Sequence, residues 1–138
     1  MGKVLGIIAE YNPFHNGHLY HLQESKKQTG STYTVAIMSG NFTQRGSTSI
    51  IDKWSKAEIA LYCGVDLVIE LPVLYSISSA ENFADGAIKI LDSLKVVDYL
   101  SFGAETADIP TLQQIAKVLY TEPRQYKTLL SHELKKGL

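Results

Sequence analysis

The sequence predicts an α/β fold in which helices cover both faces of a doubly wound parallel sheet. Short apolar runs alternate four times with segments of helical periodicity along the 138 residues. The apolar runs are nearly continuous in Val, Ile and Leu, which is typical of parallel strands buried on both faces. Units of this kind join through right-handed crossovers, so the alternation fixes the general topology as well as the fold class.

Four runs are expected to form the strands. They are residues 3–9 (KVLGIIA), 33–38 (YTVAIM), 67–71 (LVIEL) and 96–102 (VVDYLSF). Pro72 ends the third run, because proline cannot continue a strand ladder.

Each strand is followed by a segment of helical spacing. The first helix ends at Gly30 and the second at Gly64, since glycine is a common C-terminal stop. The third is expected to begin at a capping box, Ser78-x-x-Glu81, and the fourth at Asp108 and Pro110. The buried stripes are predicted to be Leu19 and Leu22; Trp54, Ala57 and Leu61; Phe83, Ala87, Ile90, Leu91 and Leu94; Leu112, Ile115, Ala116 and Leu119. Residues 126–138 also have a helical pattern.

Composition narrows the class of protein. The net charge is −1, whereas a domain that binds a nucleic-acid backbone is usually basic, so any nucleic-acid contact is expected to use a local patch or regions outside this sequence, and no DNA partner is expected. One cysteine, Cys63, excludes an internal disulfide and favours a reducing compartment. No apolar run reaches membrane-spanning length. We therefore expect a single cytoplasmic domain, residues 1–138, without a membrane partner. Because no strand follows the fourth helix, we expect the sheet to be truncated and the chain to be the N-terminal part of a longer protein.

The loop after the first strand carries the strongest functional signal. It reads EYNPFHNGH, with His15 and His18 on either side of the expected helix start and Gly17 between them. A helix N-terminus offers free N–H groups and a positive dipole end, imidazoles can donate to phosphate oxygens, and glycine lets a nucleotide approach the backbone. The alternatives are structural caps, or a metal site that lacks a third ligand in the sequence. Nucleotide binding is the favoured interpretation.

The segment GIIAEYNPFHNGHLYHL resembles the opening of the HxGH nucleotidyltransferase superfamily, which has a Rossmann-like fold. With MSGNFTQRGSTSIIDKWSKAEIAL, DLVIELP and FGAE, the pattern is similar to the bacterial tRNA(Met) cytidine acetate ligases from about Gly6 to Glu105. That family uses ATP to activate acetate as acetyl-adenylate and acetylates N4 of the wobble cytidine in elongator tRNA(Met). The resemblance implies ATP and acetate as ligands, with Mg²⁺ as a common companion of ATP.

The resemblance also implies the site residues. His15 and His18 are the expected catalytic residues, stabilising the β- and γ-phosphates as pyrophosphate leaves. The residues expected to hold ATP are Ile8, Ala9, Glu10, Tyr11, Asn12, Pro13, Phe14, His15, Asn16, Gly17, His18, Leu19, Tyr20, His21 and Gly103. The family also has a second ATP-binding segment, Ile-Ser-x-x-x-x-Arg. Ile77-Ser78-Ser79 imitates it but lacks the arginine, so it is interpreted as a helix cap and this chain alone is expected to bind ATP weakly.

Residues near the second strand are candidates for substrate contact. Gln44 and Arg45 lie in the loop 41–46, and Lys53 opens the next helix. Glu70 is expected to have a structural role at the end of the third strand. Two other functions stay open at this point: a conventional adenylyl- or cytidylyltransferase acting on a phosphorylated small molecule, and a non-catalytic nucleotide-binding module.

Overall fold

The computed structural model describes residues 2–137, and it divides after Gly103 into two compact units. The first unit contains the strands β1 (Val4–Ala9), β2 (Tyr33–Ser39), β3 (Leu67–Leu71) and β4 (Tyr99–Ser101). Its helices are α1 (Asn16–Thr29), α2 (Lys53–Tyr62), α3 (Val73–Ser76) and α4 (Ala80–Ser93). The second unit contains α5 (Ile109–Thr121) and α6 (Arg124–Leu134). All the elements expected to bind a nucleotide lie in the first unit.

The four strands form one parallel sheet in the order β3-β2-β1-β4. Ile7 of β1 is paired with Ala36 of β2 on one side and with Ser101 of β4 on the other. The chain therefore builds outward from β1 through β2 to β3, and then returns to the opposite side of β1. This reversal between β1 and β4 is the point at which open α/β sheets bind ligands.

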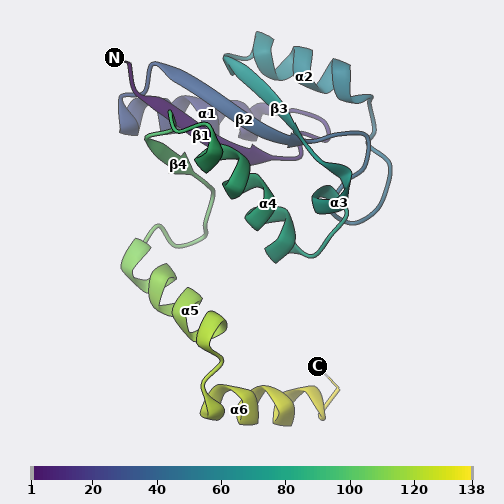
Figure 1. Ribbon diagram of the computed structural model, residues 1–138, viewed down its shortest axis with the longest axis vertical. Helices are drawn as coiled ribbons and strands as arrows, with labels where there is room; N and C mark the ends of the chain where they lie inside the picture. The colour runs from purple at the N-terminus through teal and green to yellow at the C-terminus, as the bar shows by residue number, and fades with distance from the viewer. Residues whose placement is uncertain (1, 138) are drawn as a thin grey trace. The chain divides into compact units, whose positions relative to one another are not determined.

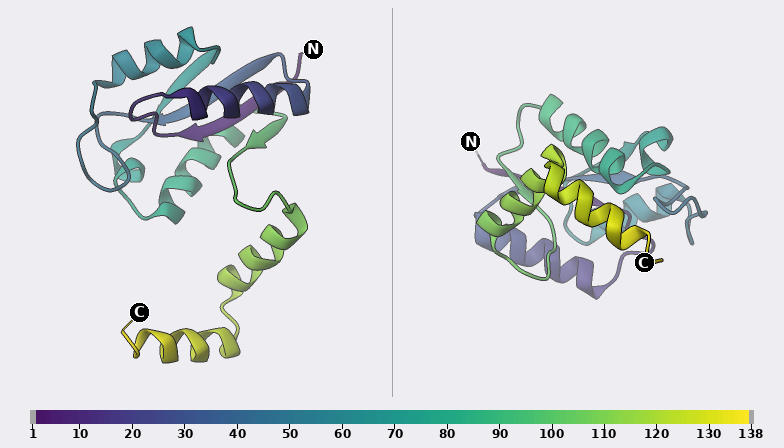
Figure 2. Two further views of the ribbon diagram at one scale, coloured as in Figure 1. Left: turned by 180° about the vertical axis from the view of Figure 1, so that it is seen from behind. Right: turned by 90° about the horizontal axis from the view of Figure 1, so that it is seen from below.

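Apolar side chains cover both faces of the sheet. On one face Leu5, Ile7 and Met38 pack in a cluster with Leu22 of α1 and Ala60 of α2. The other face has a second cluster, in which the β2 residues Val35 and Ile37 pack with the α4 residues Ala87 and Leu91. Figure 1 shows α4 in front of the sheet with α1 behind it, and the reverse view in Figure 2 brings α1 forward. The predicted doubly wound α/β fold is confirmed.

Helix α1 has the ends that its sequence predicts. His15 is its N-cap residue, and Gly30 closes it with φ 64°. That left-handed conformation is easily adopted by glycine because it has no Cβ, and the Gly30 N–H donates to the carbonyl of Lys26. The position of the His15 cap fixes where the chain leaves β1 and enters the helix.

The predicted buried face of α2 was right for Ala57, which packs against the core cluster, and wrong for its two larger residues. Trp54 is 75% exposed and Leu61 is 45% exposed, whereas Lys56 and Ala60 are fully buried. The prediction placed the indole of Trp54 toward the core, whereas the helix buries the face that carries Lys56 and Ala60. Lys56 can be buried because backbone carbonyls at the end of β2 accept from its amino group.

Three boundaries also differ from the sequence-based expectation. Ser79 caps α4, accepting from the backbone N–H of Asn82, so the predicted capping box at Ser78 was wrong. The fourth strand has three residues where seven were expected, and the short helix α3 was not predicted. Helix α6 begins at Arg124, two residues before the expected start, and α5 begins after Asp108 with proline in its first turn, as predicted. None of the described helices is long and apolar enough to span a membrane.

Candidate functional site

A cleft of about 820 Å³ opens at the C-terminal ends of β1 and β4, where the strand order reverses. One wall is the segment from Ile8 to Pro13, which leaves β1, and the opposite wall is Phe102 and Gly103, which follow β4. The beginning of α1 closes the end of the cleft with His15, Gly17, His18 and His21. Volumes of this size hold ligands as large as nucleotides.

His15 and His18 form a stacked pair at the N-terminus of α1. Their ring centroids are 3.7 Å apart and the planes are inclined by 22°. Nδ1 of His15 accepts from the Gly17 N–H at 3.1 Å, and Nδ1 of His18 accepts from the His15 N–H at 3.3 Å. Because Nδ1 is the acceptor in both rings, a neutral ring carries its proton on Nε2. Each imidazole therefore keeps one N–H donor for a ligand.

His18 is the more enclosed ring of the pair. Tyr11 packs edge-on against it with centroids 5.0 Å apart, and Phe14 lies 5.5 Å away. Burial lowers the pKa of His18 below 6.5, and the neighbouring rings of His15 and His21 lower it further. An anion in the cleft would oppose both effects, so this ring is placed to gain a proton as negative charge builds beside it.

His21 faces the cleft one turn further along α1. Its Nε2 is 2.9 Å from Oγ of Ser101, and Oγ of Ser25 is 2.7 Å from the same hydroxyl. Burial lowers the pKa of His21 as well. These contacts join α1 to the end of β4, and thereby fix the width of the cleft between its two walls.

The loop after β2 is attached to the cleft by two side chains of the β1 loop. The Gln44 backbone N–H donates to Oε1 of Glu10 at 2.5 Å. Oδ1 of Asn12 accepts from both Oγ of Ser49 and the Ile50 N–H, at 2.8 and 2.7 Å. The two loops, which are distant in sequence, therefore form one continuous rim.

The three residues expected to contact substrate lie on or beside this rim. The Gln44 amide donates to the Ser78 carbonyl at 2.8 Å, which turns its N–H away from the cleft. Arg45 is exposed to solvent. Nζ of Lys53 is 2.7 Å from Oε2 of Glu70, so this cation is paired with an acid that the sequence had suggested was structural. The cleft lining does not include any of the three.

Lys56 lies beneath the rim and is completely buried. Its Nζ donates to the carbonyls of Ser39 at 2.9 Å and Gly40 at 3.0 Å. Burial lowers the pKa of this amino group, while the charges of Glu10 and Glu70 raise it. Lys56 thus fixes the backbone where β2 ends, and provides positive charge below two carboxylates.

Eleven of the fifteen residues expected to hold ATP line the cleft; Phe14, Asn16, Leu19 and Tyr20 do not. Tyr20 is 69% exposed, and Phe14 packs on the apolar cluster beneath α1. Two residues were missed by the sequence reasoning: Phe102 in the cleft wall and Lys56 beneath the rim. Lys56 could have been noticed from its four-residue spacing to Ala60, which places both on one helix face. The described residues contain no group of three or more His, Cys, Asp or Glu side chains placed to hold a metal ion.

Comparisons with known proteins agree with this fold. The family model described as HIGH Nucleotidyl Transferase matches residues 2–138. The tRNA(Met) cytidine acetate ligase of Caldanaerobacter subterraneus subsp. tengcongensis is 61% identical over 136 residues, and that of Thermoanaerobacter sp. (strain X514) is 59% identical over 135. These alignments cover 99% and 98% of this chain, and 34% of each relative.

Among solved structures, Thermotoga maritima TmcAL bound with alpha-thio ATP superposes with a TM-score of 0.88 at 52% sequence identity. The match covers 99% of this chain and 33% of that one. The chain therefore spans about a third of the length of the relatives it matches.

Proposed function

This chain belongs to the HIGH nucleotidyl transferase family, and from that premise we propose that its cleft binds ATP for the activation of acetate. The observation that carries the proposal is the stacked pair His15 and His18, whose Nε2 atoms are left as donors at a helix N-terminus inside an 820 Å³ cleft. A helix N-terminus and two imidazoles together match the charge of a triphosphate. The alpha-thio ATP bound to Thermotoga maritima TmcAL supports the same choice of ligand.

The proposed reaction has two steps. An acetate oxygen attacks the α-phosphorus of ATP, the bond to the β-phosphate oxygen breaks, and pyrophosphate leaves with acetyl-adenylate remaining. N4 of the wobble cytidine in elongator tRNA(Met) then attacks the acetyl carbon, loses a proton, and releases AMP. The names of the relatives, tRNA(Met) cytidine acetate ligase, support this acceptor. The first step needs positioning and charge stabilisation more than covalent help, which is what His15 and His18 can supply.

We propose different roles for the two catalytic rings. His15 is exposed to the solvent, whereas His18 packs against the rings of Tyr11 and Phe14. Since burial keeps the pKa of His18 low before the nucleotide arrives, the ring gains most from the charge of the leaving pyrophosphate. Among the described residues the cleft lining has one carboxylate, Glu10, and one of its oxygens accepts from the Gln44 N–H, so Mg²⁺ would be held chiefly by phosphate oxygens and water.

The chain accounts for a third of its relatives' length, so the whole reaction is assigned to the longer protein that contains it. We place that protein in the cytoplasm, with most of the tRNA contact made outside residues 1–138. The near-neutral charge of this chain supports that division.

The test is acetate-dependent exchange of labelled pyrophosphate into ATP by the full-length protein. Exchange that requires acetate, and that falls about 100-fold or more in His18→Asn, supports the proposal. Gln23→Ala, an exposed position on the same helix, is the matched control and is expected to retain full exchange. Exchange with a phosphorylated acceptor and none with acetate would establish a conventional nucleotidyltransferase instead. Absence of exchange with either, despite ATP binding, would indicate a non-catalytic module.

A further inference from the structure

A smaller cavity opens at the C-terminal ends of β2 and β3, and neither step of the proposed reaction has been assigned to it. Its volume is about 160 Å³, and its lining includes Gly40, Asn41, Phe42, Glu70 and Ser76. Pockets for drug-sized ligands start at roughly 300 Å³, and one water takes about 30 Å³ of liquid volume. The cavity therefore has room for a single small ring, and it is too small for a nucleoside triphosphate.

Two polar side chains in the lining have hydrogen-bonding groups to spare. Oε2 of Glu70 accepts from Nζ of Lys53 at 2.7 Å, whereas its Oε1 accepts no hydrogen bond within residues 2–137. Oδ1 of Asn41 accepts from the Lys53 backbone N–H at 2.9 Å, which leaves the amide N–H groups of Asn41 as donors. The lining thus presents one carboxylate acceptor beside one amide donor.

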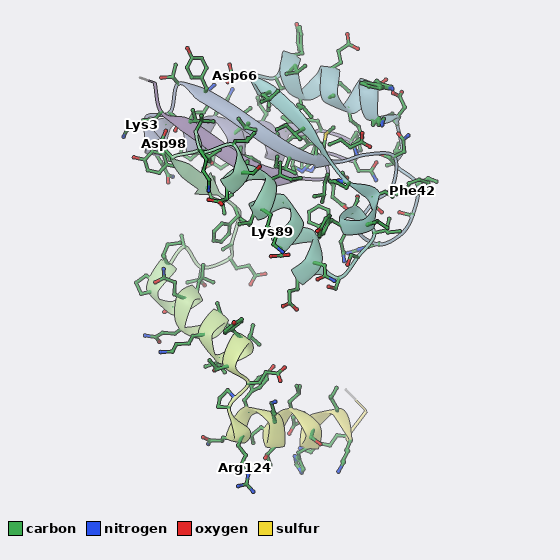
Figure 3. All side chains as sticks on the ribbon, viewed as in Figure 1. Lys3, Phe42, Asp66, Lys89, Asp98 and Arg124 are labelled. Atoms are coloured by element: carbon green, nitrogen blue, oxygen red, sulfur yellow. The ribbon has the colours of Figure 1, made fainter. Side chains whose placement is uncertain are left out.

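An aromatic ring completes the lining. Phe42 is 44% exposed, and its backbone carbonyl accepts from Oγ of Ser76 at 2.8 Å, which holds the residue against α3. Figure 3 shows Phe42 beside α3, at the end of the sheet where β3 finishes. Unpaired bases stack on exposed aromatic rings of this kind.

The pattern is complementary to cytosine. The base has an amino group at N4, which donates, next to acceptors at N3 and O2, and a carboxylate is the usual protein acceptor for N4. Uracil has a carbonyl oxygen in place of the amino group, so it would direct an acceptor at the Glu70 carboxylate. Acetate would be disfavoured by the same negative charge.

We propose that this cavity binds the cytosine base of the acceptor nucleotide, with Glu70 accepting from N4 and Asn41 donating to the adjacent edge. The assignment rests on the proposed function, because it takes cytidine as the acceptor. The cavity lies at the end of β2 and the ATP cleft at the end of β1, and neighbouring strands in a sheet are about 5 Å apart. Oγ of Ser39, at the end of β2, donates to the Glu10 carbonyl at 3.5 Å. Lys56 holds the backbone between them through the carbonyls of Ser39 and Gly40.

The test is a titration of the ¹⁵N-labelled chain with cytidine and separately with uridine, each to about 20 mM. The signals to follow are the Asn41 side-chain amide and the Gly40 backbone amide. Cytidine is expected to shift both, with a Kd about tenfold below that of uridine, as one matched base edge provides. In Glu70→Gln the carboxamide can donate as well as accept, so the preference should fall to about twofold or less. Glu58→Gln, an exposed acid on α2, is the matched control and should keep the tenfold preference.

Three results would overturn the assignment: equal affinity for both nucleosides, a preference that survives Glu70→Gln, or the same signals moving with sodium acetate and not with cytidine. A titration of the same sample with a non-hydrolysable ATP analogue, read at the imidazoles of His15 and His18, separates the two proposals. Imidazole shifts without a cytidine response refute the cytosine site alone. A cytidine response without imidazole shifts refutes the ATP cleft alone.

Discussion

The requirement for glycine at position 17 can be tested by adding one methyl group, in the variant Gly17→Ala. A Cβ at this position would lie 2.9 Å from Cε1 and 3.1 Å from Nδ1 of His15. The first distance is shorter than real contacts of a Cβ, so in Gly17→Ala the His15 ring has to leave its place over the helix N-terminus. The hydrogen bond from the Gly17 N–H, at 3.1 Å, is lost with it.

The variant is expected to weaken ATP binding strongly and to change stability only slightly. A displaced His15 loses one hydrogen bond to phosphate, and hydrogen bonds to charged groups contribute about 1.5–3 kcal/mol. The Kd for a non-hydrolysable ATP analogue should therefore rise about 10-fold to 150-fold. Loss of the cap hydrogen bond costs about 0.5–2 kcal/mol, whereas alanine is a better helix former than glycine by up to about 1 kcal/mol, so the free energy of unfolding should fall by no more than about 1 kcal/mol.

Calorimetric titration gives the Kd, and urea denaturation gives the free energy of unfolding. The imidazole signals of the unliganded variant should already show a moved His15 ring, while the signal of His132, on α6, stays unchanged. Gln23→Ala, on the exposed face of α1, should bind ATP as the unchanged chain does. A Kd for Gly17→Ala within twofold of the original value would refute the reasoning, because the ring would then not depend on the missing side chain.

Three further predictions concern stability, each measured by urea denaturation. Lys56→Met leaves two backbone carbonyls without a donor, so the free energy of unfolding should fall by about 2–4 kcal/mol, against about 0.5 kcal/mol or less for the exposed Lys89→Met. Burial holds the pKa of His18 below 6.5, so the unfolded chain binds its proton first on acidification; stability should fall from about pH 7 to pH 5, and less steeply in His18→Gln. In Gly86→Ala the new Cβ collides with the ring of Tyr75, and the expected net loss of about 1–2 kcal/mol should shrink by about half or more in a Tyr75→Ala background. An unchanged loss in that background, an unchanged pH slope in His18→Gln, or equal effects of the two lysine variants would contradict the respective prediction.

The fold class and the place of the main cleft could be predicted from the sequence because both depend on local patterns. The continuous apolar runs 33–38 and 67–71 indicated strands of a parallel sheet, and β2 and β3 lie there in parallel, although β3 is an edge strand and is only partly buried. The first loop had to reach the ligand-binding edge of such a sheet, and Gly17 next to two histidines pointed to an anion at the start of a helix. Spacing in the sequence was sufficient here because the apolar runs and the histidine motif each consist of residues that are close together in the chain.

The rest was decided by contacts between residues far apart in the chain. The burial of Lys56 was not predicted, because nothing near it in the sequence reveals that the carbonyls of Ser39 and Gly40 accept from its amino group. In the same way, the ion pair of Glu70 could not be predicted from its apolar strand, because it forms only when α2 brings Lys53 to within 2.7 Å. Local periodicity encodes which elements form, whereas burial of a charge depends on the partners that the folded sheet brings together. The sequence by itself determined the α/β architecture and the histidine motif, and only the tertiary structure decided which charged side chains are buried, paired or left free at the edge of the sheet.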